Sequence, residues 1–432
     1  MDHLGLDLGT TTISAAVLDA DGRLLCTRTV PGGAAVAGQP WERKQDARGI
    51  EHAALSLLDG LLQEFPDIGC VGLTGQMHGI VYVDAAGQLL SPLYTWQDET
   101  GAQPGPDGKS TAARLTARTG YPLASGYGLV TLACHQAAGT IPNGAAAVCT
   151  IADYLAMRLS GRTAPRLTPS MAASLGLFGG TDFDRKAVRR AGLPEQLLPE
   201  VSEEAELGGG RLRVFAALGD NQASFLGAGQ GRLDAPLVNI GTGSQFSFFT
   251  KEHRTVPGLE TRPFPGGWLL TGAPLCGGRS FALLERFFRQ TAELVTGTPC
   301  PSAYPAMLRA LEAPMPDDVP QFRTTFAGTR QDPAERAVLS GLDEENFAPV
   351  PLLHALLRGM ADELSACYRA ALKAGCAPAG RLLGSGNGLR RNPALQRSVE
   401  RSFGLPLTLA AVPEEAACGA ALFTRMQHEA AL

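Results

Sequence analysis

Short apolar runs separated by glycine-containing turns recur along the chain and predict β-strands. Residues 4–8 are apolar around one aspartate, a Gly-Thr-Thr-Thr turn follows at residues 9–12, and an apolar run resumes at residues 13–18. Two strands joined by a tight turn of glycine and hydroxyl residues form a β-hairpin. The pattern returns at residues 237–249. We therefore predict two related hairpins far apart in the chain.

The two predicted hairpins indicate an internal duplication. When their turns are aligned, Asn239 takes the place of Asp7 and both turns continue with Gly-Thr. Self-similarity at long spacing suggests two domains that open with the same unit, although short Gly/Thr turns also match by chance. A chain of 432 residues is longer than a domain built around one hydrophobic core usually is. We predict an N-terminal domain at residues 1–231 and a C-terminal domain at residues 232–432.

Helical periodicity alternates with the strand pattern and indicates an α/β architecture. Apolar residues recur every three or four positions at residues 352–364, which predicts an amphipathic helix that ends near Gly375. Asn392 precedes a proline and predicts the cap of a helix reaching residue 403. Residues 95–128 are rich in Gly, Pro and Thr, and we expect irregular, lid-like structure there.

Composition and charge narrow the function classes. The net charge is −5 and no Lys/Arg run is present, so neither nucleic acid nor an anionic membrane is an expected partner. Nine cysteines without a C-x-x-C pair fit reduced thiols better than a disulfide framework. We find no signal-peptide pattern and no apolar run of membrane-spanning length. A cytoplasmic protein, monomeric or homodimeric, is the expectation.

Three glycine turns, which begin at Gly9, Gly241 and Gly384, each follow an apolar strand. Such turns offer backbone N–H groups that can bind phosphate. Asp7, directly before the first turn, is of the residue type that holds Mg²⁺, although such an aspartate also often bonds only its local backbone. Neither a Walker nor a Rossmann glycine pattern occurs. Each turn taken singly also fits an ordinary hairpin. The predicted phosphate-binding residues are Gly9, Thr10, Thr11, Thr12, Gly241, Thr242, Gly243, Ser244, Gly384, Ser385 and Gly386.

Polar residues at other strand ends could serve an alcohol substrate. Asp220 lies between an apolar strand and a small-residue helix start, where it fits either a helix cap or a general base. Residues 75–79 (Gly-Gln-Met-His-Gly) and 96–98 (Trp-Gln-Asp) combine hydrogen-bonding groups with a flat aromatic face, as a polyol site requires. By themselves His78 and Trp96 also fit structural roles.

These motifs, in order along nearly the whole chain, resemble those of the FGGY carbohydrate kinase family. The matching segments are residues 6–12, 75–79, 219–224 and 241–244, residues 384–386 with Asn392, and residues 415–421. The resemblance implies two ribonuclease H-like (actin-like ATPase) domains with an interdomain active-site cleft. Two positions depart from the family pattern: Thr100 stands where arginine is common and Pro169 where aspartate is usual.

The resemblance also implies roles for individual residues. Asp220 is the expected catalytic base, ATP and Mg²⁺ are the expected cofactors, and Asp7 is the expected metal site. The implied sugar-binding residues are Gln76, Met77, His78, Trp96, Asp98, Asp220 and Asn221. Asn387 and Asn392 join the phosphate-binding turns in the implied ATP site.

The expected function is transfer of the γ-phosphoryl group of ATP to a ketose. The segment Trp96-Gln97-Asp98 is more similar to the sedoheptulokinase branch of the family than to the xylulokinase branch. Sedoheptulose is therefore the first expected substrate, and D-xylulose or another pentulose is the alternative. A non-catalytic ATP-binding protein of the actin or Hsp70 type is the alternative of another class, because its fold and phosphate hairpins would look similar.

Overall fold

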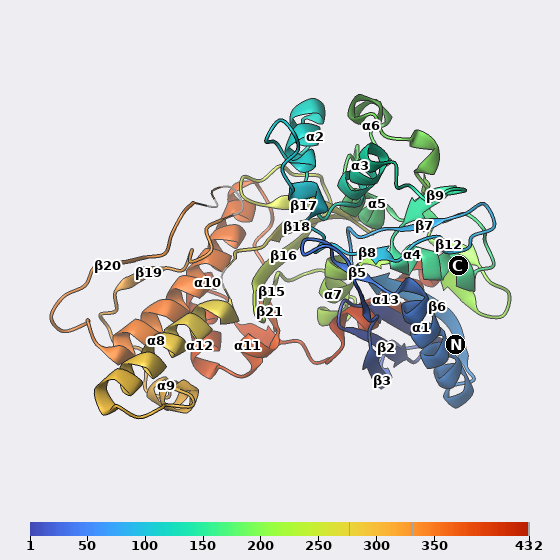
Figure 1. The fold of residues 1–432 in the computed structure, drawn as a ribbon. Helices are drawn as coiled ribbons and strands as arrows, with labels where there is room; N and C mark the ends of the chain where they lie inside the picture. Colours follow the sequence, from blue (N-terminus) through green and yellow to red (C-terminus); the bar gives the residue numbers. More distant parts are fainter. Residues whose placement is uncertain (276, 330–331, 333, 431–432) are drawn as a thin grey trace. The chain divides into compact units, whose positions relative to one another are not determined.

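The computed structural model describes residues 1–275, 277–329, 332 and 334–430. The chain divides into two compact units (Figure 1). Unit 1 consists of Met1–Gly231, Pro263–Pro265 and Val412–Leu432, and unit 2 of Arg232–Arg262 and Gly266–Ala411. Residues 412–430, which the sequence analysis placed in the C-terminal domain, thus pack with unit 1. None of the helices in the described ranges combines the length and apolar character that a membrane crossing needs.

Unit 1 is built on a sheet in the order β12-β13-β6-β1-β2-β3, with β14 also paired to β6. The predicted hairpin is confirmed as β1 (Asp2–Leu8) and β2 (Thr12–Leu18). The other members are β3 (Leu24–Pro31), β6 (Ile68–Gly75), β12 (Glu206–Gly208), β13 (Arg213–Phe215) and β14 (Leu218–Gly219). Short strands elsewhere in the unit are β4 (Ala35–Val36), β5 (Lys44–Gln45), β7 (Val81–Val83), β8 (Leu93–Tyr94), β9 (Ala147–Cys149), β10 (Arg166–Leu167) and β11 (Glu200–Val201).

Helices of unit 1 cover the sheet and bury its apolar side chains, among them Leu4, Leu6 and Leu73, with Ile50 of α1. The α-helices are α1 (Ala47–Glu64), α2 (Thr111–Thr119), α3 (Gly128–Ala138), α4 (Ile151–Leu159), α5 (Pro169–Leu175), α6 (Arg185–Ala191), α7 (Asp220–Ala228) and α13 (Glu415–Ala430). The 3₁₀ turns are η1 (Thr100–Ala102) and η2 (Glu195–Leu197).

Helix α2 corrects the prediction of irregular structure at residues 95–128. Ser110 begins the helix as its N-cap, with Oγ accepting from the N–H of Ala113, and Gly120 ends it in the left-handed conformation. Between these caps lies a short amphipathic segment that buries Leu115. The surrounding glycines and prolines hid a helix of only nine residues.

Unit 2 repeats this plan, with a sheet in the order β17-β18-β16-β15-β21-β22. Its hairpin of β15 (Leu237–Ile240) and β16 (Ser244–Thr250) pairs antiparallel, and β15 pairs in parallel with β21 (Leu382–Ser385), as β1 does with β6. The other strands are β17 (Glu260–Phe264), β18 (Gly267–Gly272) and β22 (Leu407–Leu409), with β19 (Gln321–Arg323) and β20 (Val338–Ser340) as a separate ribbon. The shared topology supports the predicted duplication.

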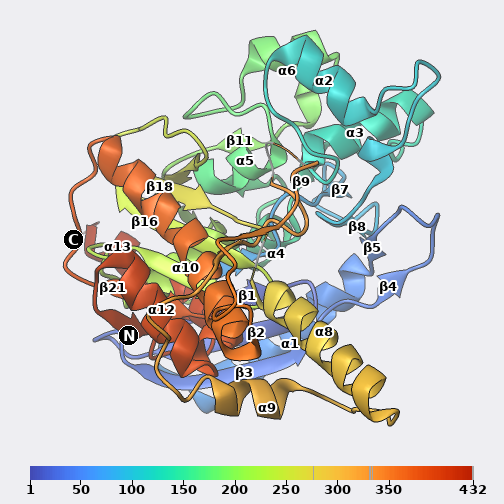
Figure 2. The same ribbon diagram turned by 90° about the vertical axis from the view of Figure 1, so that its left-hand side faces the viewer.

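The helices of unit 2 follow the sequence predictions closely. Helix α10 (Pro349–Lys373) ends just before Gly375, and the side chain of Asn392 caps α12 (Pro393–Phe403). These two helices lie side by side (Figure 2) and bury a core that includes Leu356 and Val399. The remaining helices are α8 (Gly278–Thr296), α9 (Tyr304–Ala310) and α11 (Asn387–Arg390).

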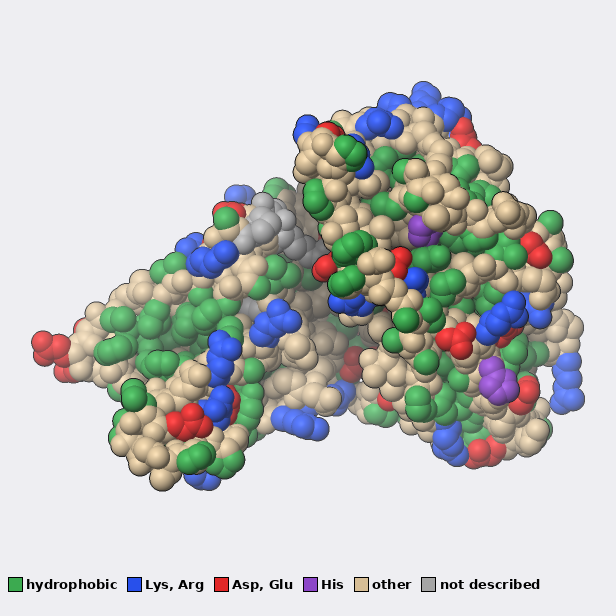
Figure 3. All heavy atoms as spheres, in the orientation of Figure 1, with side chains coloured by type: hydrophobic (Ala, Val, Ile, Leu, Met, Phe, Trp, Pro, Cys, Tyr) green, Lys and Arg blue, Asp and Glu red, His purple; other side chains and the backbone are tan. Residues whose placement is uncertain are grey.

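Surface charge agrees with the sequence analysis on the face drawn in Figure 3. Lysine and arginine side chains alternate there with acidic ones and form no continuous field of one sign. Every cysteine in the described ranges is a free thiol, as the lack of paired spacing predicted.

Helix α13 joins unit 1 through close backbone contacts with α7 and β1 (Figure 1). A Cβ on Gly419 would lie 1.8 Å from the carbonyl oxygen of Ala223, and one on Gly227 would lie 1.9 Å from that of Glu415. Gly5 of β1 meets the carbonyl oxygen of Ala417 in the same way. Neither side of these contacts can retreat, because both are backbone. Glycine at these positions therefore permits the approach of α13.

We predict that Gly419→Ala lowers the thermal unfolding midpoint by at least about 6 °C, because the added methyl group forces α13 away from α7. Gly60→Ala is the matched control: Gly60 lies inside α1, where an added Cβ would have no atom of its surroundings within 4 Å, and the substitution favours the helix. Circular dichroism measures both midpoints. Equal midpoints for Gly419→Ala and the wild type would contradict the packing account.

Candidate functional site

Three parallel strands of unit 1 end at the same edge of the sheet. In the pairing of β1 with β6, Asp7 lies opposite Thr74 and Leu8 opposite Gly75. In the pairing of β14 with β6, Gly219 also lies opposite Gly75. The residues that follow these strands, beginning with Gly9, Gln76 and Asp220, therefore emerge together. The predicted sugar, phosphate and catalytic motifs of this unit share one sheet edge.

Two carboxylates of this edge, Asp7 and Asp220, influence each other electrostatically. Burial, together with the nearby carboxylates of Asp220 and Glu414, raises the pKa of Asp7 to about 7. Gly219 is the N-cap of α7, and Asp220 is the first helical residue, with its Oδ1 accepting from the N–H of Asn221. Asp220 is thus not the cap residue, one of the two roles its sequence allowed.

Gln76 offers a buried acceptor. Its Nε2 donates to Oε1 of Gln45 at 2.9 Å, and Nε2 of Gln45 donates to the carbonyl oxygen of Thr10 at 2.7 Å. This chain of amides fixes the orientation of Gln76. Its Oε1 is buried and has no hydrogen-bond partner among the described residues. Because an unsatisfied buried acceptor costs about 1–3 kcal/mol, the position favours a ligand that donates a hydrogen bond.

His78 is held in an uncommon conformation. Its φ of 72° lies in the left-handed region, which residues other than glycine rarely adopt. Residues held in this region are often found at functional sites. Nδ1 lies 2.6 Å from the carbonyl oxygen of Ser174, and the ring stacks on Tyr127 with centroids 4.7 Å apart. A carbonyl only accepts, so Nδ1 carries the proton. In the neutral imidazole, Nε2 is then an acceptor.

Met77 and Asn221, two further predicted sugar-binding residues, are buried. The side chain of Met77 lies beneath the strand end that precedes the catalytic candidate: a Cβ on Gly219 would be 2.8 Å from the Met77 Cε. Asn221 is the second residue of α7. Met77 therefore supports the backbone beside Asp220.

The Trp96 and Asp98 side chains differ in burial and in hydrogen bonding. Asp98 is buried, and its two carboxylate oxygens accept from the backbone N–H groups of Arg43 and Thr100, each at 3.0 Å. Trp96 is 47% exposed and donates from Nε1 to Oγ1 of Thr10 at 3.1 Å. Thr100 thus contributes its main chain to the orientation of Asp98.

The first glycine turn is tight, and its hydroxyls differ in exposure. A Cβ on Gly9 would lie 2.9 Å from the carbonyl oxygen of Thr12, so this position needs glycine. Thr11 and Thr12 are exposed, whereas Thr10 is partly buried and bonded to Trp96. Pro169, the other departure from the family pattern, is the first residue of α5 behind the Thr168 N-cap.

In unit 2, the second and third glycine turns adjoin. Because β15 and β21 are parallel neighbours, with Asn239 opposite Ser385, their following turns emerge at one edge. Gly386 has a φ of 87°, and a Cβ there would lie 2.5 Å from the carbonyl oxygen of Ile240. The N–H of Gly241 donates to the carbonyl oxygen of Gly243. The close approach leaves a backbone surface of the kind that phosphates contact.

Two polar side chains of this region have distinguishable roles. Ser385 is fully buried, and its Oγ has no hydrogen-bond partner among the described residues. Asn392 is buried, and its Oδ1 accepts from the N–H of Leu395 as the cap of α12. The Asn392 oxygen is therefore committed to the helix. Asn387 is the first residue of α11, directly after the Gly386 turn.

Several residues of the site were missed from the sequence. Gln45 and Ser174 orient Gln76 and His78, and Tyr127 stacks on His78. Each is distant in sequence from the residue it supports, so no local pattern reveals it. Glu414 precedes the terminal helix motif by one residue, and the small-residue run that follows it was the available signal.

The donor set at Asp7 fits a magnesium ion that keeps much of its water. In the described ranges, no three His, Cys, Asp or Glu side chains converge closely enough to form a protein-only metal cage. Mg²⁺ characteristically binds one or two carboxylates together with water and phosphate oxygens. Burial, and then the neighbouring carboxylates of Asp220 and Glu414, raise the pKa of Asp7 by disfavouring its charged form. A cation beside Asp7 would favour that charged form.

We predict that Asp7→Asn stabilises the metal-free protein more at pH 8 than at pH 4. The folded state retains the Asp7 proton up to about pH 7, whereas the unfolded chain loses it near pH 4. Wild-type stability therefore falls between these values, by up to about 4 kcal/mol, and the variant lacks this loss. Urea unfolding at both pH values in chelator measures the difference. A pH-independent difference between variant and wild type would show that Asp7 titrates normally.

Comparison with known proteins gives the same assignment for both units. The model of the FGGY family of carbohydrate kinases, N-terminal domain, matches residues 3–230, and that of the C-terminal domain matches residues 237–428.

Individual proteins similar to this chain are also sugar kinases. Sedoheptulokinase of Mus musculus is 29% identical over 97% of this chain and 96% of its own length. Xylulose kinase of Streptomyces coelicolor is 25% identical over 97% of this chain and 86% of its own. The crystal structure of xylulose kinase from Rhodospirillum rubrum superposes with a TM-score of 0.82 at 22% identity, covering 99% of this chain and 90% of that one. These matches, with the actin-like, ribonuclease H-like topology of both units, rule out the alternative of a non-catalytic ATP-binding protein. The chain belongs to the FGGY family of carbohydrate kinases.

Proposed function

We propose that this kinase transfers the γ-phosphoryl group of ATP to the terminal hydroxyl of sedoheptulose, giving sedoheptulose 7-phosphate. The observation that carries the proposal is the gathering of Asp7, Gln76 and Asp220 at the ends of three parallel strands. Similarity to mouse sedoheptulokinase over almost the full length of both chains supports the choice of sugar.

The sugar-binding part of the proposal rests on acceptors and a flat apolar face. Oε1 of Gln76 and Nε2 of His78 accept hydrogen bonds from sugar hydroxyls, while Asp98 contributes carboxylate lone pairs beyond those used by the backbone. The exposed indole of Trp96 packs on the carbon chain. A polyol satisfies the buried Gln76 acceptor, whereas a ligand without hydroxyls leaves it unpaired.

In the chemical step, Asp220 orients the terminal hydroxyl and accepts its proton. The hydroxyl oxygen forms a bond to the γ-phosphorus, and the bond from that phosphorus to the bridging oxygen of ADP breaks. The proton passes to the carboxylate, so the products are ADP and the sugar phosphate. A general base of this kind typically contributes about 10²–10⁴ in rate.

Nucleotide binding is assigned to the glycine turns. In unit 2, the turns at residues 241–244 and 384–387 provide backbone N–H groups and the buried Ser385 hydroxyl. In unit 1, the turn at residues 9–12 provides hydroxyl donors. Asp7 would hold Mg²⁺ through a carboxylate oxygen or a water. When bound, the ion neutralises charge on the phosphate oxygens.

D-Xylulose is the second candidate substrate, because the Streptomyces coelicolor xylulose kinase also aligns with 97% of this chain. One methylene or hydroxyl changes pocket affinity by only about 1–3 kcal/mol. The identity of the site residues therefore does not distinguish the two sugars, and kinetic measurements with each sugar are needed.

We predict that Asp220→Asn lowers kcat at least about 100-fold and leaves the affinity for ATP within about twofold, because the amide cannot accept the proton. A coupled ADP-release assay gives kcat, and calorimetry gives nucleotide affinity. Asp59→Asn, at an exposed position of α1, is the matched control. Full turnover in Asp220→Asn would remove this residue from the reaction.

We predict that kcat/KM is at least about tenfold higher for sedoheptulose than for D-xylulose, ribulose, gluconate or glycerol. The same ADP-release assay across these five compounds provides the ranking. D-Xylulose in first place would replace the proposed substrate while leaving the kinase assignment intact. ADP release independent of every added sugar would contradict the proposed reaction.

A further inference from the structure

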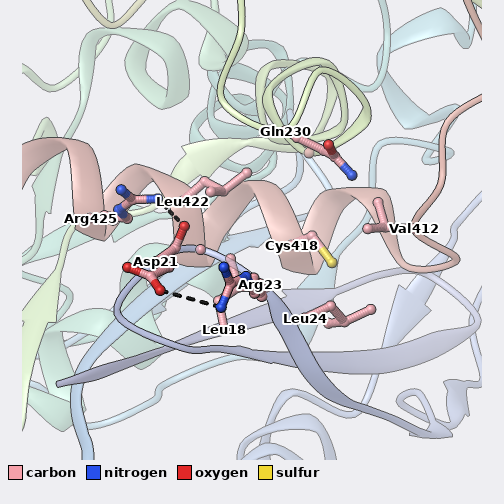
Figure 4. Close-up of a pocket in the computed structure, with 11 residues that line it drawn as sticks. Leu18, Asp21, Arg23, Leu24, Gln230, Val412, Cys418, Leu422 and Arg425 are labelled. Carbon is pink, nitrogen blue, oxygen red and sulfur yellow. Dashed lines mark hydrogen bonds and ion pairs between the residues drawn. The ribbon is translucent and has the colours of Figure 1, made fainter.

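A cavity of about 400 Å³ lies in unit 1 at the sheet edge opposite the candidate site (Figure 4). Its position follows from strand direction: β2 runs antiparallel to β1, so Leu18 pairs with His3 while Ile13 pairs with Leu8. Residues of the β2–β3 turn, the end of α7, and α13 line it. The volume is within the range of small-molecule sites. None of the proposed catalytic or substrate-binding residues contributes to its wall.

Two arginines and the Asp21 carboxylate line one end of the cavity (Figure 4). Arg425 donates from Nη1 to the carbonyl oxygen of Asp21 at 2.7 Å and from Nε to Glu429 at 2.9 Å. These two bonds leave the Nη2 group of Arg425 available to a ligand. Arg23 lies on the other side of Asp21, with its Nη1 3.5 Å from the Asp21 carboxylate, and the Arg23 and Asp21 side chains are largely exposed. Such an exposed pair is weak, so an anionic ligand can replace the Asp21 carboxylate.

The other end is apolar. Leu24, Val412 and Cys418 surround it, and in Figure 4 they lie away from Arg425. Burial, with help from nearby glutamates, raises the pKa of the Cys418 thiol to about 12, so this group stays neutral. A wholly polar ligand, such as a free sugar, leaves this end of the cavity without matching contacts.

Gln230 adds an amide at the wall in a strained conformation. Its φ is 52°, at the end of α7 where glycine would be favoured. At this position a glutamine costs backbone energy that a glycine would avoid. Its amide can donate to and accept from a ligand.

We propose that this cavity is an effector site for a compact anion, a phosphate or a carboxylate, that carries an apolar or aromatic body, and that occupancy changes the rate of phosphoryl transfer. The anion would bind Arg23 and Arg425, and the body would lie over Leu24, Val412 and Cys418.

Two helices connect the cavity to the catalytic carboxylates. Helix α7 begins at Asp220 and reaches the cavity wall at Gly227, while α13 follows Glu414, an electrostatic neighbour of Asp7, and reaches the wall at Arg425. The glycine contacts between these helices leave no room for one to shift alone. A ligand that displaces either helix therefore acts on both carboxylates.

The test uses the full chain with the nucleotide site filled by a non-hydrolysable ATP analogue and Mg²⁺. Phenyl phosphate and benzoate are titrated by calorimetry as the two anionic probes. Inorganic phosphate lacks the apolar body, and phenol lacks the charge. Leu24→Trp fills the cavity, and Leu25→Trp is the control because Leu25 is the exposed next residue of β3 and does not line it. Circular dichroism checks that both variants fold.

We predict saturable binding of at least one anionic probe, tighter than that of phosphate or phenol. Arg23→Gln should raise its Kd about tenfold, and Leu24→Trp at least tenfold, with no change in Leu25→Trp. With any sugar that supports turnover, the probe should change the ADP-release rate at least about twofold in wild type and Leu25→Trp only. Absent binding, equal binding of phosphate, undiminished binding in Leu24→Trp, or an unaffected rate would each overturn the proposal. Binding is measured without turnover, so the binding results do not depend on which sugar is the substrate, and the rate can be measured with any sugar that supports turnover.

Discussion

The parallel pairing of β1, β6 and β14 is the constraint on which the site of unit 1 depends. A parallel register brings the carboxyl ends of neighbouring strands to one edge, so residues more than 200 positions apart become neighbours. Asp7, Gln76 and Asp220 owe their proximity to this register alone. A shift of one residue in either pairing would turn their side chains to the other face.

In the absence of ligands, this edge of the sheet carries several features that are unfavourable for the free energy of folding. Asp7 is partly buried near other carboxylates, Gln76 keeps an unsatisfied acceptor, and His78 holds a left-handed backbone. Each feature is unfavourable in isolation, and the first two match groups that a sugar kinase binds: a cation and a hydroxyl donor. The charge of Asp7 and the acceptor of Gln76 thus lie where a bound ligand can satisfy them, while the sheet behind is apolar and closely packed.

Features carried by local sequence could be predicted, and features carried by long-range contacts could not. The two hairpins, the end of α10 near Gly375 and the Asn392 cap each depend on a few adjacent residues. Helix α2 was missed because glycine and proline surround it, and the return of residues 412–430 to unit 1 depends on glycine contacts with α7. The amide chain through Gln45 joins residues that are far apart, so spacing gave no sign of it.

A crystal structure with a non-hydrolysable ATP analogue, Mg²⁺ and sedoheptulose tests the central claim most directly. The account predicts that Oε1 of Gln76 accepts from a sugar hydroxyl and that a carboxylate oxygen of Asp220 lies within hydrogen-bonding distance of the terminal hydroxyl. A sugar bound without contact to this sheet edge, with Asp220 directed away from its hydroxyls, would contradict it.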